Sequence, residues 1–169
     1  MRLWKREHLQ RAFGRERRLI FEDDPGRAVA RARTDGRRVL VWAGRETELL
    51  RDTQDITVLR VEDGMLRSKG LGADLVPPMS LVADDLGIAH DPARESRLER
   101  LIAEGPPPGG EARAERLVAR MLRAGLTKYN LEKGGLPLMP KGYTVLVPGQ
   151  VEDDASGLLG AGAEHTNLA

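Results

Sequence analysis

The sequence predicts an α/β fold with a largely parallel sheet, because short apolar runs alternate with helical patterns along the chain. The clearest buried strand is 39–44, VLVWAG, a continuous apolar run that a glycine closes. A β-branched run at 56–61, ITVLRV, predicts a second strand. The length of 169 residues suits one domain, or one domain and a fragment.

Helices and short strands are predicted around these two runs in the N-terminal half. Apolar residues 3, 4, 9 and 13 recur among basic ones at rough helical spacing, which indicates a helix. It either packs on the core, which we favour, or lies on a membrane surface. Residues 18–21 read as a short strand, and Pro25 begins a helix that Gly36 ends. Residues 46–51 form a short helix or turn, and 81–83 a further strand.

The C-terminal half is predicted to contain two helices, a linker and a last strand. A short strand and turn at 87–91 leads into a helix at 92–102, with Asp91 as N-cap and Pro92 first. The proline-rich stretch 105–110 cannot be helical, and a second helix follows at 111–124. The first helix is expected to turn Leu98, Leu101 and Ile102 inward, and the second Leu117, Val118, Met121 and Leu122. The last strand is predicted at 143–147, with 145–147 buried.

Composition excludes several classes of protein and of site. Forty per cent of residues are hydrophobic, which supports a folded core. A net charge of +1 argues against nucleic-acid binding driven by bulk charge. The chain has no cysteine, so disulfides and thiolate metal sites are excluded, and its three histidines lack ligand spacing. No apolar run is long enough to span a membrane and the charged start is unlike a signal peptide, so a cytoplasmic protein is expected, with peripheral membrane contact left open.

Acidic residues follow three of the predicted strands. They are Glu62 and Asp63 before Gly64, then Asp84 and Asp85, and finally residues 152–154. Open α/β sheets place their chemistry at strand ends, although solvated turn carboxylates are the favoured explanation for any one such pair. A metal at 152–154 is a further alternative.

Three stretches resemble the bacterial capsule polysaccharide biosynthesis family of retaining β-Kdo transferases. They are RVEDGMLRSKGLGADLVPPMSLVADDLGI at 60–88, LTKYNL at 126–131 and VLVPGQVEDDAS at 145–156. The similarity is greatest to the C-terminal module of the bifunctional capsular enzyme, and it follows the order of the family along nearly the whole chain.

This resemblance implies the Rossmann-like N-terminal lobe of a GT-B-type glycosyltransferase. Residues 1–141 would form that acceptor-side lobe, and 142–169 the first strand and loop of a donor-side lobe. The implied donor is CMP-β-Kdo and the acceptor is a lipid-linked Kdo chain on phosphatidylglycerol, with no cofactor or metal. Other capsule assembly proteins and the inner membrane are the implied partners.

The family motifs assign roles to individual residues. Retention implies a covalent intermediate on a carboxylate, which maps to Asp154 with Gln150 beside it. The Glu-Asp-Gly-x-x-Arg-Ser motif makes Glu62 or Asp63 the group that orients the acceptor hydroxyl or handles its proton. The same motif adds Ser68 to the substrate-binding residues and makes Arg67 a partner for a Kdo carboxylate. Lys128 and Asn130 either contact substrate or tie the lobes together.

One departure from the family pattern concerns the second lobe. Its Lys-Pro-His-Pro, Gly-Phe-Glu-Ala and Gly-Trp-Gly segments, where CMP is expected to sit, do not occur in this sequence. We therefore expect the polypeptide alone to transfer little or no sugar. A non-catalytic module that binds acidic glycans or lipid headgroups is the alternative. A nucleotide-binding regulator is a third class, but no Gly-x-Gly-x-x-Gly or Walker loop supports it.

Overall fold

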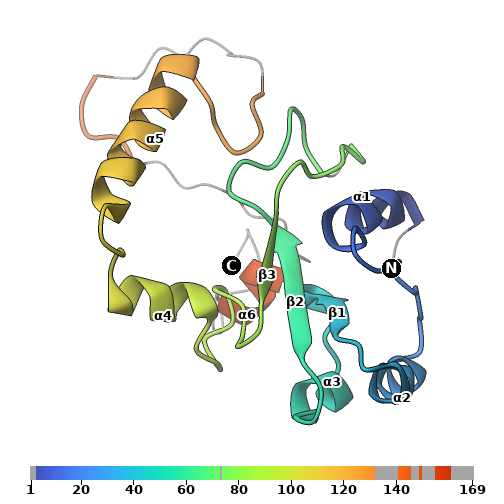
Figure 1. The fold of residues 1–169 in the computed structure, drawn as a ribbon. Coiled ribbons are helices and arrows are strands. Elements are labelled where there is room, and N and C mark those ends of the chain that lie inside the picture. The colour runs from blue at the N-terminus through green and yellow to red at the C-terminus, as the bar shows by residue number, and fades with distance from the viewer. Residues whose placement is uncertain (1–2, 73, 132–140, 146–148, 150–154, 161–169) are drawn as a thin grey trace.

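The computed structural model describes residues 3–72, 74–131, 141–145, 149 and 155–160. Ten elements follow one another along these ranges (Figure 1). They are α1 (Leu3–Phe13), α2 (Pro25–Asp35), β1 (Val39–Trp42), the 3-10 turn η1 (Ala43–Arg45), α3 (Glu48–Asp52), β2 (Val58–Asp63), β3 (Leu81–Asp84), α4 (Arg97–Glu104), α5 (Gly110–Ala124) and α6 (Ala155–Gly160).

The sheet has three strands in the order β1-β2-β3 and is mixed. Strands β1 and β2 are parallel, with Val39 opposite Val58, and α3 lies in the crossover between them. Strands β2 and β3 are antiparallel, with Asp63 opposite Leu81. The α/β class is confirmed, but the expected largely parallel sheet is wrong. The described residues between β2 and β3, 64–72 and 74–80, contain no helix to carry a crossover, and β3 pairs with β2 as an antiparallel neighbour.

A compact apolar cluster covers one face of the sheet. Val41 and Val58 lie on that face, and Val29 of α2 and Leu50 of α3 pack against them. All four side chains are buried. Side chains alternate between the faces of a strand, so Leu40 and Leu59, which are paired in register, lie on the opposite face. The helices α2 and α3 therefore cover only one side of β1 and β2.

The N-terminal helix packs on the fold, as we favoured from the sequence. Leu9 of α1 is buried, and Phe13 is half-buried. The Lys5 ammonium lies over the Trp42 ring, 3.3 Å from its centroid, which ties α1 to the end of β1. Helix α1 thus lies against the fold beside the sheet (Figure 1).

Helix α2 has the boundaries that its sequence signals predict. The carboxylate of the N-cap Asp24 accepts a hydrogen bond from the amide of Arg27 at 2.7 Å, and Pro25 occupies the first position. Gly36 ends the helix with φ of 59°, a left-handed conformation that glycine adopts without strain.

Two predicted strands are absent, and α4 begins later than predicted. Residues 18–21 and 87–91 have no strand structure. Helix α4 starts at Arg97 because Ser96 and Glu99 form a capping box, in which each side chain bonds the backbone of the other residue. Asp91 caps only a local turn, where it accepts from the amide of Ala93 at 2.9 Å.

Helices α4 and α5 expose the apolar faces that we expected to be inward. Exposure runs from 38% for Leu98 to 76% for Leu122, and of the expected residues only Met121 is half-buried. Figure 1 shows why: α5 stands apart from the sheet, joined to α4 at one end. The predicted linker between them is correct, since Gly105 and Gly109 both have positive φ. The sequence showed only the helical spacing of these apolar residues, and that spacing does not indicate whether another element covers the apolar face.

The predicted last strand falls mostly outside the part of the chain that the structure describes. Residues 143–145 have no strand structure, and 146 and 147 are not among the described residues. None of the described helices combines the length and the apolar character that crossing a bilayer requires.

Candidate functional site

The candidate site begins where β2 ends. Glu62 and Asp63 are the last residues of the strand, and both are half-buried. Gly64 follows, and its amide donates to the carbonyl of Ser80 at 2.9 Å. A side chain at position 64 would meet Ser80 Oγ at 2.3 Å, so only glycine lets the chain turn this closely against the start of β3.

Arg67 is buried beneath the loop that follows β2 and supports it by hydrogen bonds. Its side chain is 1% exposed. Its Nε donates to Asp63 Oδ2 at 2.5 Å, and its Nη1 donates to both Ser68 Oγ and the carbonyl of Val76 at 2.8 Å. One guanidinium thus joins the end of β2 to both sides of the 64–80 loop. To reach a Kdo carboxylate, Arg67 would have to give up these partners.

The segment after α5 binds the same loop through its backbone (Figure 1). The carbonyl of Lys128 accepts from the amides of Arg67 at 2.8 Å and Ser68 at 3.3 Å. The carbonyl of Tyr129 accepts from the amide of Gly70 at 2.8 Å. Two stretches about sixty residues apart in sequence are therefore held together as one unit.

Asn130 completes this contact with its side chain. Its Nδ2 donates to the carbonyl of Ser68 at 2.9 Å, and its Oδ1 accepts from the amide of Thr127 at 3.0 Å. Its φ of 48° is in the left-handed region, which asparagine tolerates better than most residues. Ser68 itself is buried, and its hydroxyl donates to the carbonyl of Gly70. Asn130 and Ser68 thus hold the two segments together.

Lys128 contributes to the structure by its carbonyl and leaves its side chain exposed. The ammonium lies 5.3 Å from the centroid of the Tyr129 ring. Lys69, on the loop that this segment binds, is also exposed. The sequence alone did not indicate Lys69. The structure places Lys69 near Lys128 because the neighbouring residues Ser68 and Gly70 bond the carbonyls of Lys128 and Tyr129. Both exposed ammonium groups are thus carried by the two segments that pair through their backbones.

The second acidic pair, Asp84 and Asp85, lies at the opposite end of the strands from Asp63. Because β3 is antiparallel to β2, Asp84 is opposite Arg60 and lies away from Asp63. The Asp84 carboxylate is 3% exposed and accepts from the amides of Leu86, Gly87 and Arg97, which fixes the start of α4. Arg97 binds Asp85 through two nitrogens and holds the pKa of that carboxyl below its usual range. This pair is structural.

A buried ion pair supports β2 from the side of the core. Arg60 Nη2 donates to Glu46 Oε1 at 2.5 Å, and both side chains are under a tenth exposed. Arg94 approaches the same Glu46 oxygen at 3.8 Å. The sequence did not predict this cluster, because the spacing of positions 46, 60 and 94 does not indicate that their side chains meet.

Two of the sequence-predicted residues, Gln150 and Asp154, lie outside the described part of the chain. Hydrogen bonds join five of the others: Asp63, Arg67, Ser68, Lys128 and Asn130. Glu62 precedes Asp63 on β2, and its side chain points to the other face of the sheet. Among the residues that the structure describes, no group of three or more carboxylate or histidine side chains is placed to hold a metal ion. The acidic run 152–154 is not among those residues.

Two proteins of similar sequence are named for capsule polysaccharide and for lipopolysaccharide. The chain is 35% identical to the capsule polysaccharide modification protein LipA of Neisseria meningitidis, over 99% of this chain and 25% of that protein. It is 47% identical over 119 residues to the lipopolysaccharide-processing protein LpsZ of Rhizobium meliloti, over 66% of this chain and 27% of that protein. The chain thus spans about a quarter of the length of these curated relatives.

Two similar solved structures are from Thermosulfurimonas dismutans, and both are 31% identical to this chain. One is KpsC, beta Kdo 2,7 transferase, with a TM-score of 0.70 over 99% of this chain and 52% of that one. The other is KpsC, beta Kdo 2,4 transferase, with a TM-score of 0.55 over 73% and 40%. The sequence model of the family described as capsule polysaccharide biosynthesis protein matches residues 42–127, which include the β2 strand end and the loop after it. The chain belongs to the capsule polysaccharide biosynthesis protein family.

Proposed function

We propose that this chain serves retaining transfer of β-Kdo from CMP-β-Kdo to a lipid-linked acceptor that ends in Kdo. The observation that carries the proposal is the likeness to a beta Kdo 2,7 transferase over 99% of this chain. The chain spans 52% of that protein, and from the order of the family motifs we assign it the acceptor-side part of the reaction. In this proposal residues 1–141 are the Rossmann-like acceptor lobe of a GT-B enzyme, and 142–169 begin the donor lobe.

The proposed chemistry consists of two successive inversions at the anomeric carbon of Kdo. In the first, the Asp154 carboxylate attacks that carbon and the bond to CMP breaks, with Gln150 beside it. In the second, an acceptor hydroxyl attacks the same carbon, the bond to Asp154 breaks, and the hydroxyl proton passes to a carboxylate. The configuration of the sugar is therefore retained overall.

Glu62 is our candidate for the carboxylate that receives this proton. Asp63 is the alternative from sequence, and its Oδ2 accepts a hydrogen bond from Arg67 Nε. Glu62 lies beside it at the strand end, with its Oε2 3.3 Å from the amide of Asp63. A carboxylate at the end of a paired strand is held more rigidly than one on a free loop, which suits proton transfer to a defined atom.

Lys128 is our candidate for recognising the carboxylate of a Kdo acceptor. A charged hydrogen bond to a carboxylate favours an acidic sugar over a neutral one. The Lys128 ammonium is exposed, whereas the Arg67 guanidinium is buried among protein partners. The fold uses the carbonyl of Lys128, while its ammonium lies over the Tyr129 ring and is exposed to a ligand.

Calorimetric titration with a Kdo-terminated disaccharide tests this assignment. Lys128→Ala is expected to weaken binding about tenfold, the loss of one charged hydrogen bond of about 1.5 kcal/mol. Arg113→Ala removes an exposed positive charge near the start of α5 and is the matched control, with unchanged binding. Equal binding of a disaccharide that ends in a neutral hexose would contradict the proposed recognition.

A transfer assay separates the enzyme from a simple binding module. The chain is incubated with CMP-β-Kdo and the same acceptor, and products are followed by mass spectrometry. We expect acceptor binding with little or no transfer, because we assign CMP to the donor lobe. Steady transfer by the 169-residue chain would contradict the assignment of donor and acceptor binding to separate lobes.

A further inference from the structure

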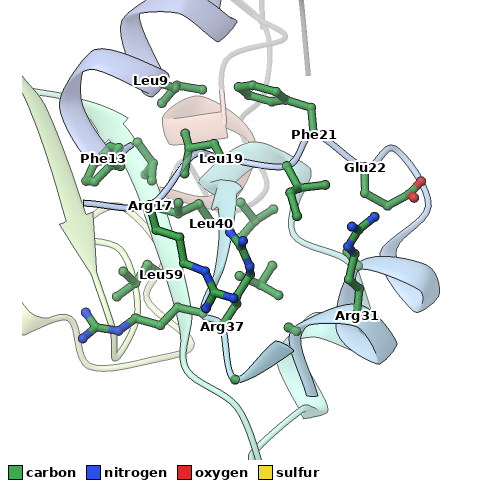
Figure 2. A pocket seen from close by; sticks show the side chains of 18 of the residues that line it. Leu9, Phe13, Arg17, Leu19, Phe21, Glu22, Arg31, Arg37, Leu40 and Leu59 are labelled. Carbon is green, nitrogen blue, oxygen red and sulfur yellow. The ribbon is translucent and has the colours of Figure 1, made fainter. Parts of the chain in front are cut away.

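A hollow of about 490 Å³ lies between α1, α2 and β1, away from the candidate site (Figure 2). None of its lining residues is among the Kdo-transfer residues assigned above. Three consecutive residues of β1 line it, Val39, Leu40 and Val41. Side chains of consecutive residues point to opposite faces of a sheet, so a hollow that contacts all three lies along the edge of β1.

The edge of β1 beside the hollow pairs with no strand among the residues that the structure describes. The sheet has the order β1-β2-β3, so β1 is paired only along its other edge. There, the amide of Val39 donates to the carbonyl of Thr57 at 3.0 Å. Backbone groups of successive residues alternate between the two edges of a strand, so the amide and carbonyl of Leu40 point to the unpaired edge. Unpaired backbone groups of this kind are a template for a further strand.

The segment 19–22 also lines the hollow but does not pair with β1. The sequence predicts a strand at 18–21, and these residues have no strand structure. The amide of Leu19 donates to Gln10 Oε1 at 2.9 Å, and the carbonyl of Arg18 accepts from Arg37 Nη1 at 2.9 Å. Among the described residues, no backbone hydrogen bond joins this segment to β1. The edge of β1 is therefore available to a strand from another molecule.

The floor of the hollow is apolar. Leu9 and Phe13 of α1 lie over Leu40 and Leu59 of the sheet (Figure 2). Leu40 and Leu59 belong to the sheet face that α2 and α3 leave uncovered. A strand added to β1 would place every second side chain on this face, where an apolar side chain is removed from water.

The rim of the hollow is rich in arginine. Four arginines line it: Arg17, Arg31, Arg37 and Arg38. Arg17 Nη1 donates to the carbonyl of Asp35 at 3.1 Å, and Arg37 Nη1 bonds a carbonyl in the same way. Carbonyl partners position a guanidinium without neutralising its charge.

Carboxylates near the rim offset only part of this charge. Two glutamates, Glu16 and Glu22, also line the hollow. Glu22 is already paired with Arg27 at 3.0 Å, and that arginine is not one of the four. One further carboxylate, Asp35, is shared between Arg31 at 3.4 Å and Arg37 at 3.5 Å. The described rim therefore keeps a net positive charge, which complements an acidic partner.

We propose that this hollow docks an extended, acidic segment of a partner protein, which adds as a strand to the unpaired edge of β1. Main-chain hydrogen bonds to β1 would hold the segment, and the two surfaces of the hollow would select its side chains. Alternate residues are apolar, to lie on the leucine floor, and flanking residues are acidic, to meet the arginine rim. The site is independent of the proposed transfer reaction, so either proposal can fail without the other.

Titration calorimetry with three blocked octapeptides tests the chemistry of the segment. The probe DEVLVTED combines an apolar centre with acidic flanks and should bind saturably to one site. The peptide KKVLVTKK, with basic flanks, and the peptide DESSSTED, with a polar centre, should each bind at least about tenfold more weakly. Equal affinity for the acidic and basic peptides, or for the apolar and polar centres, would overturn the proposal, as would no binding of DEVLVTED.

N-methylated forms of the acidic peptide test whether it pairs as a strand. One form carries methyl groups on the amides of its two valines, and the other on the amides of its leucine and threonine. A strand presents alternate amides to its neighbour, so one form should bind about tenfold more weakly and the other nearly as well as the parent peptide. Hydrogen exchange of the Leu40 amide should also slow when the parent peptide binds. Equal affinities of the two methylated forms, or unchanged exchange at Leu40, would contradict pairing with β1.

Rim variants locate the binding on the protein. Arg17→Ala combined with Arg38→Ala changes only exposed side chains and should weaken binding of DEVLVTED about tenfold. Arg113→Ala, on α5, removes an equally exposed arginine outside the hollow and should have no effect. An equal loss in both would show that overall charge alone attracts the peptide, and the proposed site would be wrong. Dimers of the chain that DEVLVTED dissociates would assign the hollow to a second copy and overturn the choice of a partner protein.

Discussion

Replacing Arg67 by alanine should be costly, because its buried guanidinium connects three parts of the candidate site. It binds the Asp63 carboxylate, the Ser68 hydroxyl and the Val76 carbonyl. Alanine would leave the carboxylate without its counter-charge and the carbonyl of Val76 without this donor. Gly72 lies so close that a side chain there would meet Arg67 Nη2 at 2.7 Å, so the truncation also opens a void.

The expected loss follows from these contacts. Breaking a fully buried ion pair costs about 3–5 kcal/mol. The Asp63 side chain is 25% exposed, so water replaces part of that interaction and we take about 2 kcal/mol. An unsatisfied carbonyl adds about 1–2 kcal/mol. The total of about 3–4 kcal/mol corresponds to a fall in melting temperature of about 6–16 °C for a chain of this length.

Urea unfolding followed by circular dichroism measures this loss. Arg97→Ala is the matched control, since it removes an arginine whose partner Asp85 is 40% exposed, and it should cost no more than about 1 kcal/mol. Arg67→Ala with a cost equal to that of Arg97→Ala would refute the claim that Arg67 braces the loop.

Three further predictions concern the same loop and the edges of the sheet. Gly64→Ala should lower the free energy of unfolding by about 1–3 kcal/mol, because the new methyl would be 2.3 Å from Ser80 Oγ; a neutral result in urea would contradict this close approach. Asn130→Ala should cost more than Asn130→Gly, because glycine keeps the φ of 48° even though both lose the bond to Ser68; melting temperatures decide the order. Asp85, whose pKa Arg97 lowers, stabilises the fold above the unfolded carboxyl pKa of about 4, and this contribution is lost as pH falls through the lower folded value. The stability difference between the wild type and Asp85→Asn should therefore shrink below about pH 4, and a constant difference would contradict the pairing.

Local signals in the sequence were enough to place several elements. Asp24, Pro25 and Gly36 fixed the ends of α2, because capping depends on a few neighbouring atoms. The apolar run at 39–44 contained β1, and the run at 56–61 contained most of β2. The family motifs marked the loop after β2 and the 126–131 segment, and hydrogen bonds join five of the predicted residues there.

Long-range pairing was beyond those signals. The direction of β3 depends on the loop after β2 returning directly, which its glycines and prolines do not reveal. The burial of Arg67 depends on a carboxylate four residues earlier and a carbonyl nine residues later. Lys128 binds the loop through its backbone carbonyl, a contact that no side-chain pattern encodes. Helical spacing also predicted buried faces on α4 and α5, but periodicity carries no information on whether a partner is present.

Backbone amide NMR shifts during titration with a Kdo-terminated acceptor test the location of the site most directly. The account predicts saturable shifts at Gly64, Lys69 and Lys128, where β2 ends and the 126–131 segment binds the loop. The amide shifts of Leu86 and Arg97, which bond Asp84 at the opposite end of the strands, should not change. Shifts confined to Leu86 and Arg97, or no saturable shift at all, would contradict the assignment of acceptor binding to the end of β2 at Glu62 and Asp63.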